Sequence, residues 1–150
     1  MNDEASGIES YKPETDSDWL LQHVVDLTNT GISVPVTLTT AAGLVTGVTI
    51  RGAEYLDLFK LELTKNWPSD MQGTYSEVVE QWKADVYPQP SSVEHDGPEH
   101  FASFIHLKDA RVVNAGTVVP GNRGMIWRGR LSSVIGFTVG VLSPSSAGEE

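Results

Sequence analysis

The run FIHLK at residues 104–108 decides the fold, and it opens the stretch of residues 101–142. Its isoleucine and leucine point to one side of an extended chain, while His106 and Lys108 point to the other side. This two-residue period is typical of a half-buried β-strand. After Asp109 the apolar positions change phase, which predicts a bulge or a sharp bend within the strand.

A second run, MIWRGRL at residues 125–131, repeats the alternation. Trp127 lies on the apolar side and is expected in the core, whereas Arg128 and Arg130 point to water. On the apolar side of this run, Gly129 stands between Trp127 and Leu131. A glycine between two large side chains predicts a tight bend or a close approach of the backbone. Alternating apolar residues after position 136 predict one more strand.

The first part of the chain predicts a helix followed by a β-hairpin. Residues 1–15 are acidic and poor in apolar side chains, which is typical of a disordered tail. A broad apolar stripe over residues 18–29 predicts an amphipathic helix that packs on the sheet. Residues 34–39 and 45–51 alternate and predict a hairpin, with Pro35 at a sheet edge because proline cannot donate to a ladder.

The middle of the chain is richer in helix-forming residues. Residues 53–67 fit a strand as well as a helix, but their length and their Glu, Leu and Lys content favour a helix that ends before Pro68. Thr74 and Glu77 have the spacing of a capping box, which predicts a second, short helix to about residue 85. Its apolar stripe is expected to pack in the core rather than to dock a partner. The stripe consists of Tyr75, Val78, Val79 and Trp82.

The remaining segments predict loops. Residues 86–100 contain three prolines and are expected to form a mobile linker, and residues 143–150 are expected to form a disordered tail. Residues 114–124 are expected to connect two strands. Before the last strand, the turn lies either at residues 135–136 or at residues 132–133, since isoleucine disfavours the positive φ that a tight hairpin needs.

Together these segments predict a single α+β domain over residues 16–142. Its centre is a small, mostly antiparallel sheet or barrel of about five strands, with an N-terminal helix and a helical insertion at residues 53–85. The strand order, and Arg-Gly pairs at residues 51–52 and 128–129, resemble an SH3-like or Sm-like barrel. Fold alone does not give function.

Charge is unevenly distributed along the chain, whose net charge is −10. Residues 1–18 carry six acids against one lysine, residues 19–100 carry eleven acids against four basic residues, and residues 101–142 carry one acid against five. So acidic a chain argues against nucleic-acid binding, which needs a cationic footprint. This uneven distribution permits contact between the basic sheet of one copy and the acidic N-terminal arm of another. A solvated surface of mixed charge explains the distribution equally well.

Composition also indicates the expected environment. There is no cysteine, which removes disulfide and thiolate chemistry and fits a cytosolic protein. No window approaches the roughly 18 apolar residues of a membrane span, and the acidic N-terminus lacks the apolar segment of a secretory signal. We therefore expect a cytoplasmic protein that does not enter a membrane.

Motifs for catalysis or metal binding are weak. Residues 94–100 hold two histidines and three acids, but glycine and proline break the segment, so a specific metal site is not expected. Gly116 and Gly121 have the gap of a phosphate-binding loop but lack the lysine that follows it. His106 has no partner at a local spacing and is expected to be a surface or cross-strand hydrogen-bonding residue. We expect neither an enzyme nor a cofactor.

The order of three short motifs resembles the C-terminal half of the gas vesicle accessory protein U family. The resemblance reaches back, more weakly, to about Trp19, so it covers most of the chain. None of the motifs is a catalytic signature, and their combination and order carry the resemblance. The matching residues are Phe104, Ile105, His106, Leu107, Lys108, Trp127, Arg128, Gly129, Gly136, Phe137 and Gly140.

This resemblance implies a non-enzymatic protein that supports the formation, organisation or clustering of gas vesicles. The implied partners are other gas vesicle proteins or the vesicle shell, and we expect the chain to form homo-oligomers. The residues expected to make the interaction are His106, Lys108, Trp127, Arg128 and Arg130. The alternative is an Sm-like RNA-binding module. A cryptic enzyme would need His106, or His95 and His100, to be buried among acids.

Overall fold

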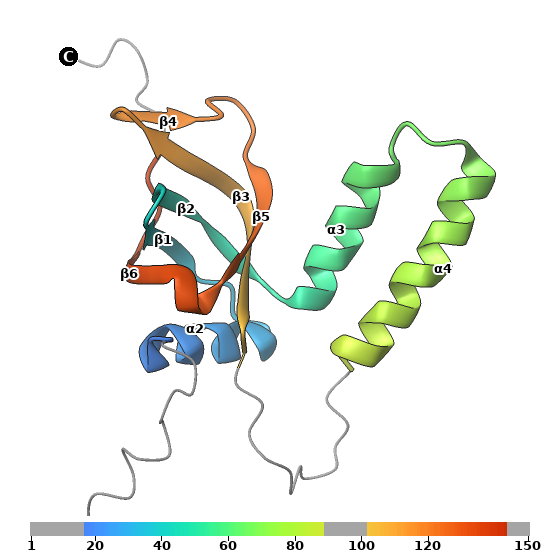
Figure 1. Ribbon diagram of the computed structural model, residues 1–150, viewed down its shortest axis with the longest axis horizontal. Helices are drawn as coiled ribbons and strands as arrows, with labels where there is room; N and C mark the ends of the chain where they lie inside the picture. The colour runs from blue at the N-terminus through green and yellow to red at the C-terminus, as the bar shows by residue number, and fades with distance from the viewer. Residues whose placement is uncertain (1–16, 89–101, 144–150) are drawn as a thin grey trace, which may run out of the picture.

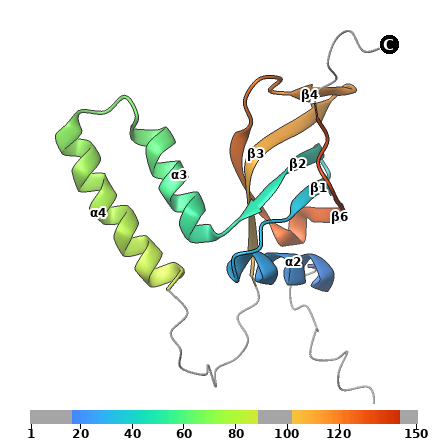
Figure 2. The same cartoon turned by 180° about the vertical axis from the view of Figure 1, so that it is seen from behind.

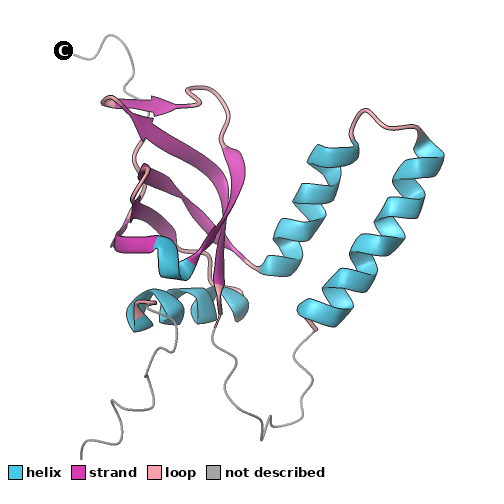
Figure 3. Cartoon of the chain, in the orientation of Figure 1, coloured by secondary structure: helices cyan, strands magenta, loops and turns pink. Residues whose placement is uncertain are grey.

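The computed structural model describes residues 17–88 and 102–143. A curled antiparallel sheet forms its centre, one helix lies across one end of the sheet, and a helical hairpin stands to the side (Figures 1 and 3). The view from behind shows the second helix of this hairpin as the outermost element (Figure 2). The described elements are, in chain order, α2 (Trp19–Asn29), β1 (Pro35–Thr40), β2 (Gly43–Ile50), α3 (Gly52–Thr64), α4 (Ser69–Val86), β3 (Phe104–Asn114), β4 (Thr117–Val119), β5 (Met125–Arg130), the 3-10 helix η2 (Leu131–Ser133) and β6 (Val134–Val139).

The sheet has six strands in the order β4-β3-β2-β1-β6, and β5 pairs with β3 on the edge that β4 also uses. Because all the pairings are antiparallel and three helices accompany them, the α+β class is confirmed. The expectation of about five strands misses β4, a three-residue strand inside the predicted connection. Within the described chain β5 and β6 do not pair, so the sheet is open and its closure into an SH3-like or Sm-like barrel is not confirmed.

Strand β1 lies inside the sheet, between β2 and β6. The prediction that Pro35 marks a sheet edge is therefore wrong. Pro35 is the first residue of the strand, a position at which the missing N–H is tolerated. Of the two turns considered before β6, the one at residues 132–133 is correct, since these residues lie in η2 while residues 135–136 lie in β6.

The predicted interruption of β3 is confirmed at Asp109. This residue has a positive φ of 51°, and the register of β3 shifts here against both β2 and β5. On β2 the shift falls at Gly47, where an added Cβ would lie 3.0 Å from the Lys108 carbonyl oxygen. The bulge turns β3 so that Ala110 is buried instead of following the exposed side of the strand.

Helix α2 supplies one wall of the core, as predicted. Its N-cap is Asp18, whose carboxylate accepts a hydrogen bond from the Leu20 N–H at 2.9 Å. Thr28 on the helix and Thr49 on β2 share a buried hydrogen bond of 2.6 Å, which fixes α2 to the sheet. The buried apolar core consists of Leu21, Val24, Val25, Val36, Leu38, Val45, Ile105, Leu107, Ala110, Leu131 and Val134.

Replacing Asp18 by alanine is expected to lower the free energy of unfolding by about 1 kcal/mol, because the Leu20 N–H loses its side-chain acceptor. Urea denaturation measures the difference. The matched control is His23→Ala, which changes an exposed residue of the same helix and should cost less than about 0.5 kcal/mol. Equal losses in the two variants would contradict the capping role.

The chain between β2 and β3 contains a helical hairpin. Helix α3 confirms the helical alternative for residues 53–67, and Pro68 becomes the N-cap residue of α4. The predicted capping box is wrong, because α4 begins at Ser69 and Thr74 lies inside it. There the Thr74 hydroxyl donates to the Asp70 carbonyl oxygen at 3.1 Å, so it is not free to cap a helix start.

The apolar stripe predicted to lie in the core is only partly buried. Val79 is fully buried where α4 meets α3, but Val78 and Trp82 are 39% and 41% exposed and Tyr75 is half-buried. The prediction of core packing is therefore wrong for most of the stripe.

The predicted tails and most of the predicted linker lie outside the described residues, although α4 itself continues to Val86. No helix within the described ranges is long and apolar enough to cross a bilayer.

Candidate interaction surface

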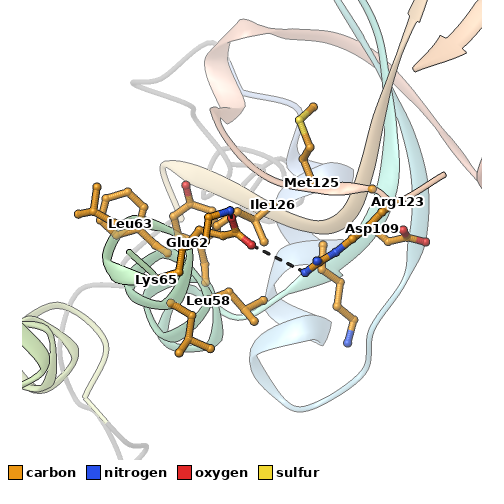
Figure 4. Close-up of a pocket in the computed structure, with 13 residues that line it drawn as sticks. Leu58, Glu62, Leu63, Lys65, Asp109, Arg123, Met125 and Ile126 are labelled. Atoms are coloured by element: carbon orange, nitrogen blue, oxygen red, sulfur yellow. Dashed lines mark hydrogen bonds and ion pairs between the residues drawn. The ribbon is translucent and has the colours of Figure 1, made fainter. Parts of the chain in front are cut away.

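A groove of about 850 Å³ separates α3 from the paired strands β3 and β5 (Figure 4). Helix α3 forms one wall, and the bulge of β3, the loop before β5 and the start of β5 form the other. Leu61, Leu63 and Met125 are exposed, so the groove is an apolar surface that is open to water. Its apolar lining consists of Leu58, Phe59, Leu61, Leu63, Met125 and Ile126.

Exposed ion pairs cross the groove or lie beside it. Arg123 reaches from the loop before β5 toward Glu62 on α3, with 3.8 Å between nitrogen and oxygen (Figure 4). Lys65 also pairs with Glu62, and Lys108 pairs with Glu54 at 3.5 Å. Each such pair contributes only about 0–1 kcal/mol. They can therefore be exchanged for contacts with another chain at little cost.

Arg128 and Arg130 form a second exposed feature, on one face of the paired strands β3 and β5. The guanidinium carbon of Arg128 lies 3.9 Å from the centre of the Phe104 ring, and that of Arg130 lies 6.0 Å from it. Within the part of the chain that the structure describes, neither arginine forms an ion pair with a carboxylate. Two cations that stack on a ring and lack an acidic partner can bind an anionic group.

His106 is buried, so the surface alternative of its prediction is wrong, and among the described residues its imidazole contacts aromatic rings and has no cross-strand hydrogen bond. It is only 5% exposed, because α3 and the residue after α4 cover its side of β3. The Tyr55 ring centre lies 4.8 Å from that of the imidazole, and the Tyr87 ring lies edge-on at 6.1 Å. Burial, and then the positive charge of Arg128, lower the pKa of His106 to about 4. The imidazole is therefore neutral at pH 7 and packs as an aromatic ring.

The sequence did not reveal Tyr55 and Tyr87 as neighbours of His106. Tyr87 belongs to the segment predicted to be a linker, yet its ring lies so close to Gly52 that an added Cβ there would collide with it. Burial raises the pKa of Tyr55 above its usual value of 10.0, and the charge of Arg128 acts in the opposite direction. The one local signal is Gly52 itself, since glycine at a helix start often marks a close approach.

Trp127 points to the opposite face of β5 from Arg128 and packs against the core, as predicted. Its ring covers Gly129, because a Cβ added to Gly129 would collide with the ring. The predicted close approach at Gly129 is therefore confirmed. Of the five residues expected to make the interaction, Lys108, Arg128 and Arg130 are exposed, whereas His106 is buried and Trp127 is half-buried.

The other motif residues hold the sheet together. Ile105 and Leu107 are in the core, and Phe137 packs against it from β6. Gly140 has a φ of 124°, and its N–H donates to the Pro35 carbonyl oxygen at 2.8 Å, which ties the end of β6 to β1. Gly136 lies in β6 with open space where a Cβ would be.

The weak metal and phosphate motifs do not form a site in the described part of the chain. The histidines of residues 94–100 lie outside it, and residues 17–88 and 102–143 contain no group of three His, Asp or Glu side chains placed to hold a metal ion. Gly116 has a φ of 79° and, with Ala115 at 50°, makes the turn between β3 and β4. It is therefore a hairpin glycine.

Comparison with known proteins identifies the family. A family model described as gas vesicle protein GvpU-like matches residues 18–142, from the N-cap of α2 to beyond β6. The matched range includes all three motifs that carry the sequence resemblance. No curated protein and no solved structure matches the chain. Because the family model covers most of its 150 residues, the chain belongs to the gas vesicle protein GvpU-like family, whose members are gas vesicle accessory proteins.

Proposed function

We propose that this chain acts in the cytoplasm as a non-enzymatic accessory protein that self-associates and supports the formation, organisation or clustering of gas vesicles. In this proposal the acidic N-terminal segment of one copy contacts the basic face of another. We define the basic face as Lys108, Arg128 and Arg130. The other partners are gas vesicle proteins or the vesicle shell.

One observation carries the proposal: Arg128 and Arg130 are exposed, stack on Phe104 and have no carboxylate partner in the described chain. Residues 1–18 of the same chain carry six acids against one lysine. An acidic segment from a second copy therefore supplies the charge that the arginines lack. Such pairs are screened by salt, so the association should depend on ionic strength.

The open sheet supports the proposal in a second way. In the described chain β5 pairs only with β3, and β6 pairs only with β1, so each has an unpaired outer edge. An extended segment can add to such an edge through main-chain hydrogen bonds, while side chains on the strand select its charge. On β5 the selecting side chains are Arg128 and Arg130.

Light scattering at low and high ionic strength tests the self-association. At low salt we expect an average mass at least about twice that of the monomer, and at high salt a mass close to that of the monomer. The variant Arg128→Glu/Arg130→Glu should be monomeric under both conditions. Arg51→Glu/Lys65→Glu changes the net charge equally at exposed positions off the basic face and should still associate. A monomer at every salt concentration, or equal effects of both variants, would contradict the proposal.

Flotation with purified gas vesicles tests the vesicle role separately. The intact chain should rise with the vesicles, and the Arg128→Glu/Arg130→Glu variant should show whether the same face makes the contact. The Sm-like RNA-binding alternative gains no support from the open sheet or from a net charge of −10.

A further inference from the structure

Helix α4 carries an apolar row that nothing in the described chain covers completely. We call it the α4 stripe: Met71, Tyr75, Val78, Trp82 and Val86. Met71 and Val86 are 52% and 62% exposed, and Val78 and Trp82 are about two-fifths exposed. The residues are separated by three or four positions, so they lie along one side of the helix over about 22 Å.

Aromatic rings make the α4 stripe continuous with the turn between the two helices. The ring of Trp67 meets that of Tyr75 at 5.4 Å, and Tyr75 meets Trp82 at 6.0 Å, both edge-on. Ring contacts of this kind fix the side chains in place. A partner helix would therefore find a pre-ordered apolar surface.

One border of the stripe is the side of α4 that packs on α3. Val79 is fully buried there, and Ser76 accepts a hydrogen bond from Lys60 at 3.2 Å. Lys83 donates to Asp57 at 3.0 Å. The contacting residues Ser76, Val79 and Lys83 each stand one position after a stripe residue. A partner helix that packed on the stripe would therefore lie beside α3 and form a three-helix arrangement with α3 and α4.

The other border of the stripe is acidic. Asp70, Glu77 and Asp85 precede stripe residues by one position, and all three are exposed. Lys83 is the single base of α4, and it is already bonded to Asp57 and Glu80. The apolar stripe is therefore flanked by α3 on one side and, on the other, by carboxylates that form no ion pair with the residues that the structure describes.

We propose that the α4 stripe binds an amphipathic helix of a partner protein that carries a row of lysine or arginine beside its apolar face. Apolar contacts along a helix supply affinity, and charges beside them select the partner. A second copy of α4 would bring two acidic rows together, which is unfavourable. An anionic lipid surface would be repelled by the same carboxylates.

This inference does not depend on the proposed self-association, because it uses a different surface. The partner of the α4 stripe is basic, whereas the segment proposed to bind the basic face is acidic. The two can be separated experimentally. Variants of Arg128 and Arg130 should leave the α4 stripe unchanged, and variants of the stripe should leave the salt-dependent mass unchanged. If stripe variants instead abolished self-association, a second copy would be the occupant and the inference would be wrong.

Fluorescence anisotropy with synthetic peptides tests the inference on the full chain. The probe is a labelled amphipathic helical peptide with leucine on one side and lysine beside it, and its match has glutamate in place of lysine. We expect the lysine peptide to bind at least about tenfold more tightly than the glutamate peptide. No binding of the lysine peptide, or equal binding of both, would overturn the inference.

Two variants separate the stripe from general attraction to an acidic protein. Met71→Ser/Val78→Ser keeps every charge and should weaken binding of the lysine peptide at least about fivefold, whereas Ile135→Ser/Val139→Ser, on β6, should not. Glu77→Lys/Asp85→Lys should reverse the preference in favour of the glutamate peptide. Glu149→Lys/Glu150→Lys changes the net charge equally and should not reverse it. Circular dichroism shows that each variant is folded, and an unreversed preference would contradict the acidic row as the selector.

Discussion

Lowering the pH from 7 to 4 is expected to remove about 3 kcal/mol of the free energy of unfolding through His106 alone. The folded pKa is about 4, whereas an exposed histidine titrates near 6.5. Between these values the unfolded chain binds a proton that the folded chain does not, so the unfolded state gains stability as the pH falls. The contribution of neutral His106 to the free energy of unfolding is therefore complete above about pH 6.5 and is lost progressively as the pH falls to about 4.

His106→Phe isolates this effect, because phenylalanine keeps an aromatic ring between Tyr55 and Tyr87 but does not titrate. Urea midpoints at pH 7, 5.5 and 4 give the free energy of unfolding for each protein. The variant should lose about 3 kcal/mol less than the parent over this range. His23→Gln removes an exposed histidine, and its free energy of unfolding should change with pH as that of the parent does. An identical pH slope in the His106→Phe variant would show that the buried imidazole is not the source.

Gly129→Ala is expected to lower the free energy of unfolding by about 1–3 kcal/mol. The added Cβ would occupy space held by the Trp127 ring, and that ring packs against the core. The ring must therefore leave its position or the strand must shift. Gly136→Ala is the matched control, because Gly136 is also in a strand but has open space at the Cβ position. It should be neutral or slightly stabilising.

A double variant tests whether the Trp127 ring causes the loss. In a Trp127→Leu background the smaller side chain leaves room, so Gly129→Ala should cost at least about 1 kcal/mol less than in the parent. Thermal or urea unfolding of the four proteins completes the cycle. If Gly129→Ala lowered the free energy of unfolding equally in the two backgrounds, the Trp127 ring would not be the cause of the loss.

Most of the sheet could be predicted from the sequence because its signals are local. Alternation over residues 104–108 and the phase change at Asp109 come from neighbouring side chains, and both correspond to observed features of β3. The same holds for the body of α2, although its N-cap residue was not identified from the sequence. The short β4 was missed because three residues are too few to show a period.

Burial of His106 could not be predicted because the covering residues are distant in the chain. Alternation shows that His106 and Ile105 point to opposite sides, but it does not show that Tyr55 on α3 and Tyr87 after α4 cover the histidine. Exposure of Arg128 and Arg130 followed from alternation alone. The lack of an acidic partner for them among the described residues did not, because pairing depends on which carboxylates the fold brings near them.

The start of α4 shows the limit of short motifs. Thr74 and Glu77 satisfy the capping-box spacing, yet the helix starts at Ser69 and runs past them. Gln72 explains part of this, because its side chain donates to the carbonyl oxygens of Thr64 and Trp67, both at 2.9 Å, and closes the turn from α3. These acceptors lie at the end of α3 and in the turn that follows it, so they cannot be read from the capping-box residues.

The place where the α3–α4 hairpin joins the sheet has an evolutionary consequence. The chain leaves β2 at Ile50 and re-enters β3 beside it, since Ile50 and His106 are direct partners in the ladder. Strand pairing therefore does not need the intervening segment, which can lengthen, shorten or acquire new surface residues while the register is inherited unchanged. Substitutions along the α4 stripe can therefore alter what that surface binds while the ladder between β2 and β3 keeps its partners.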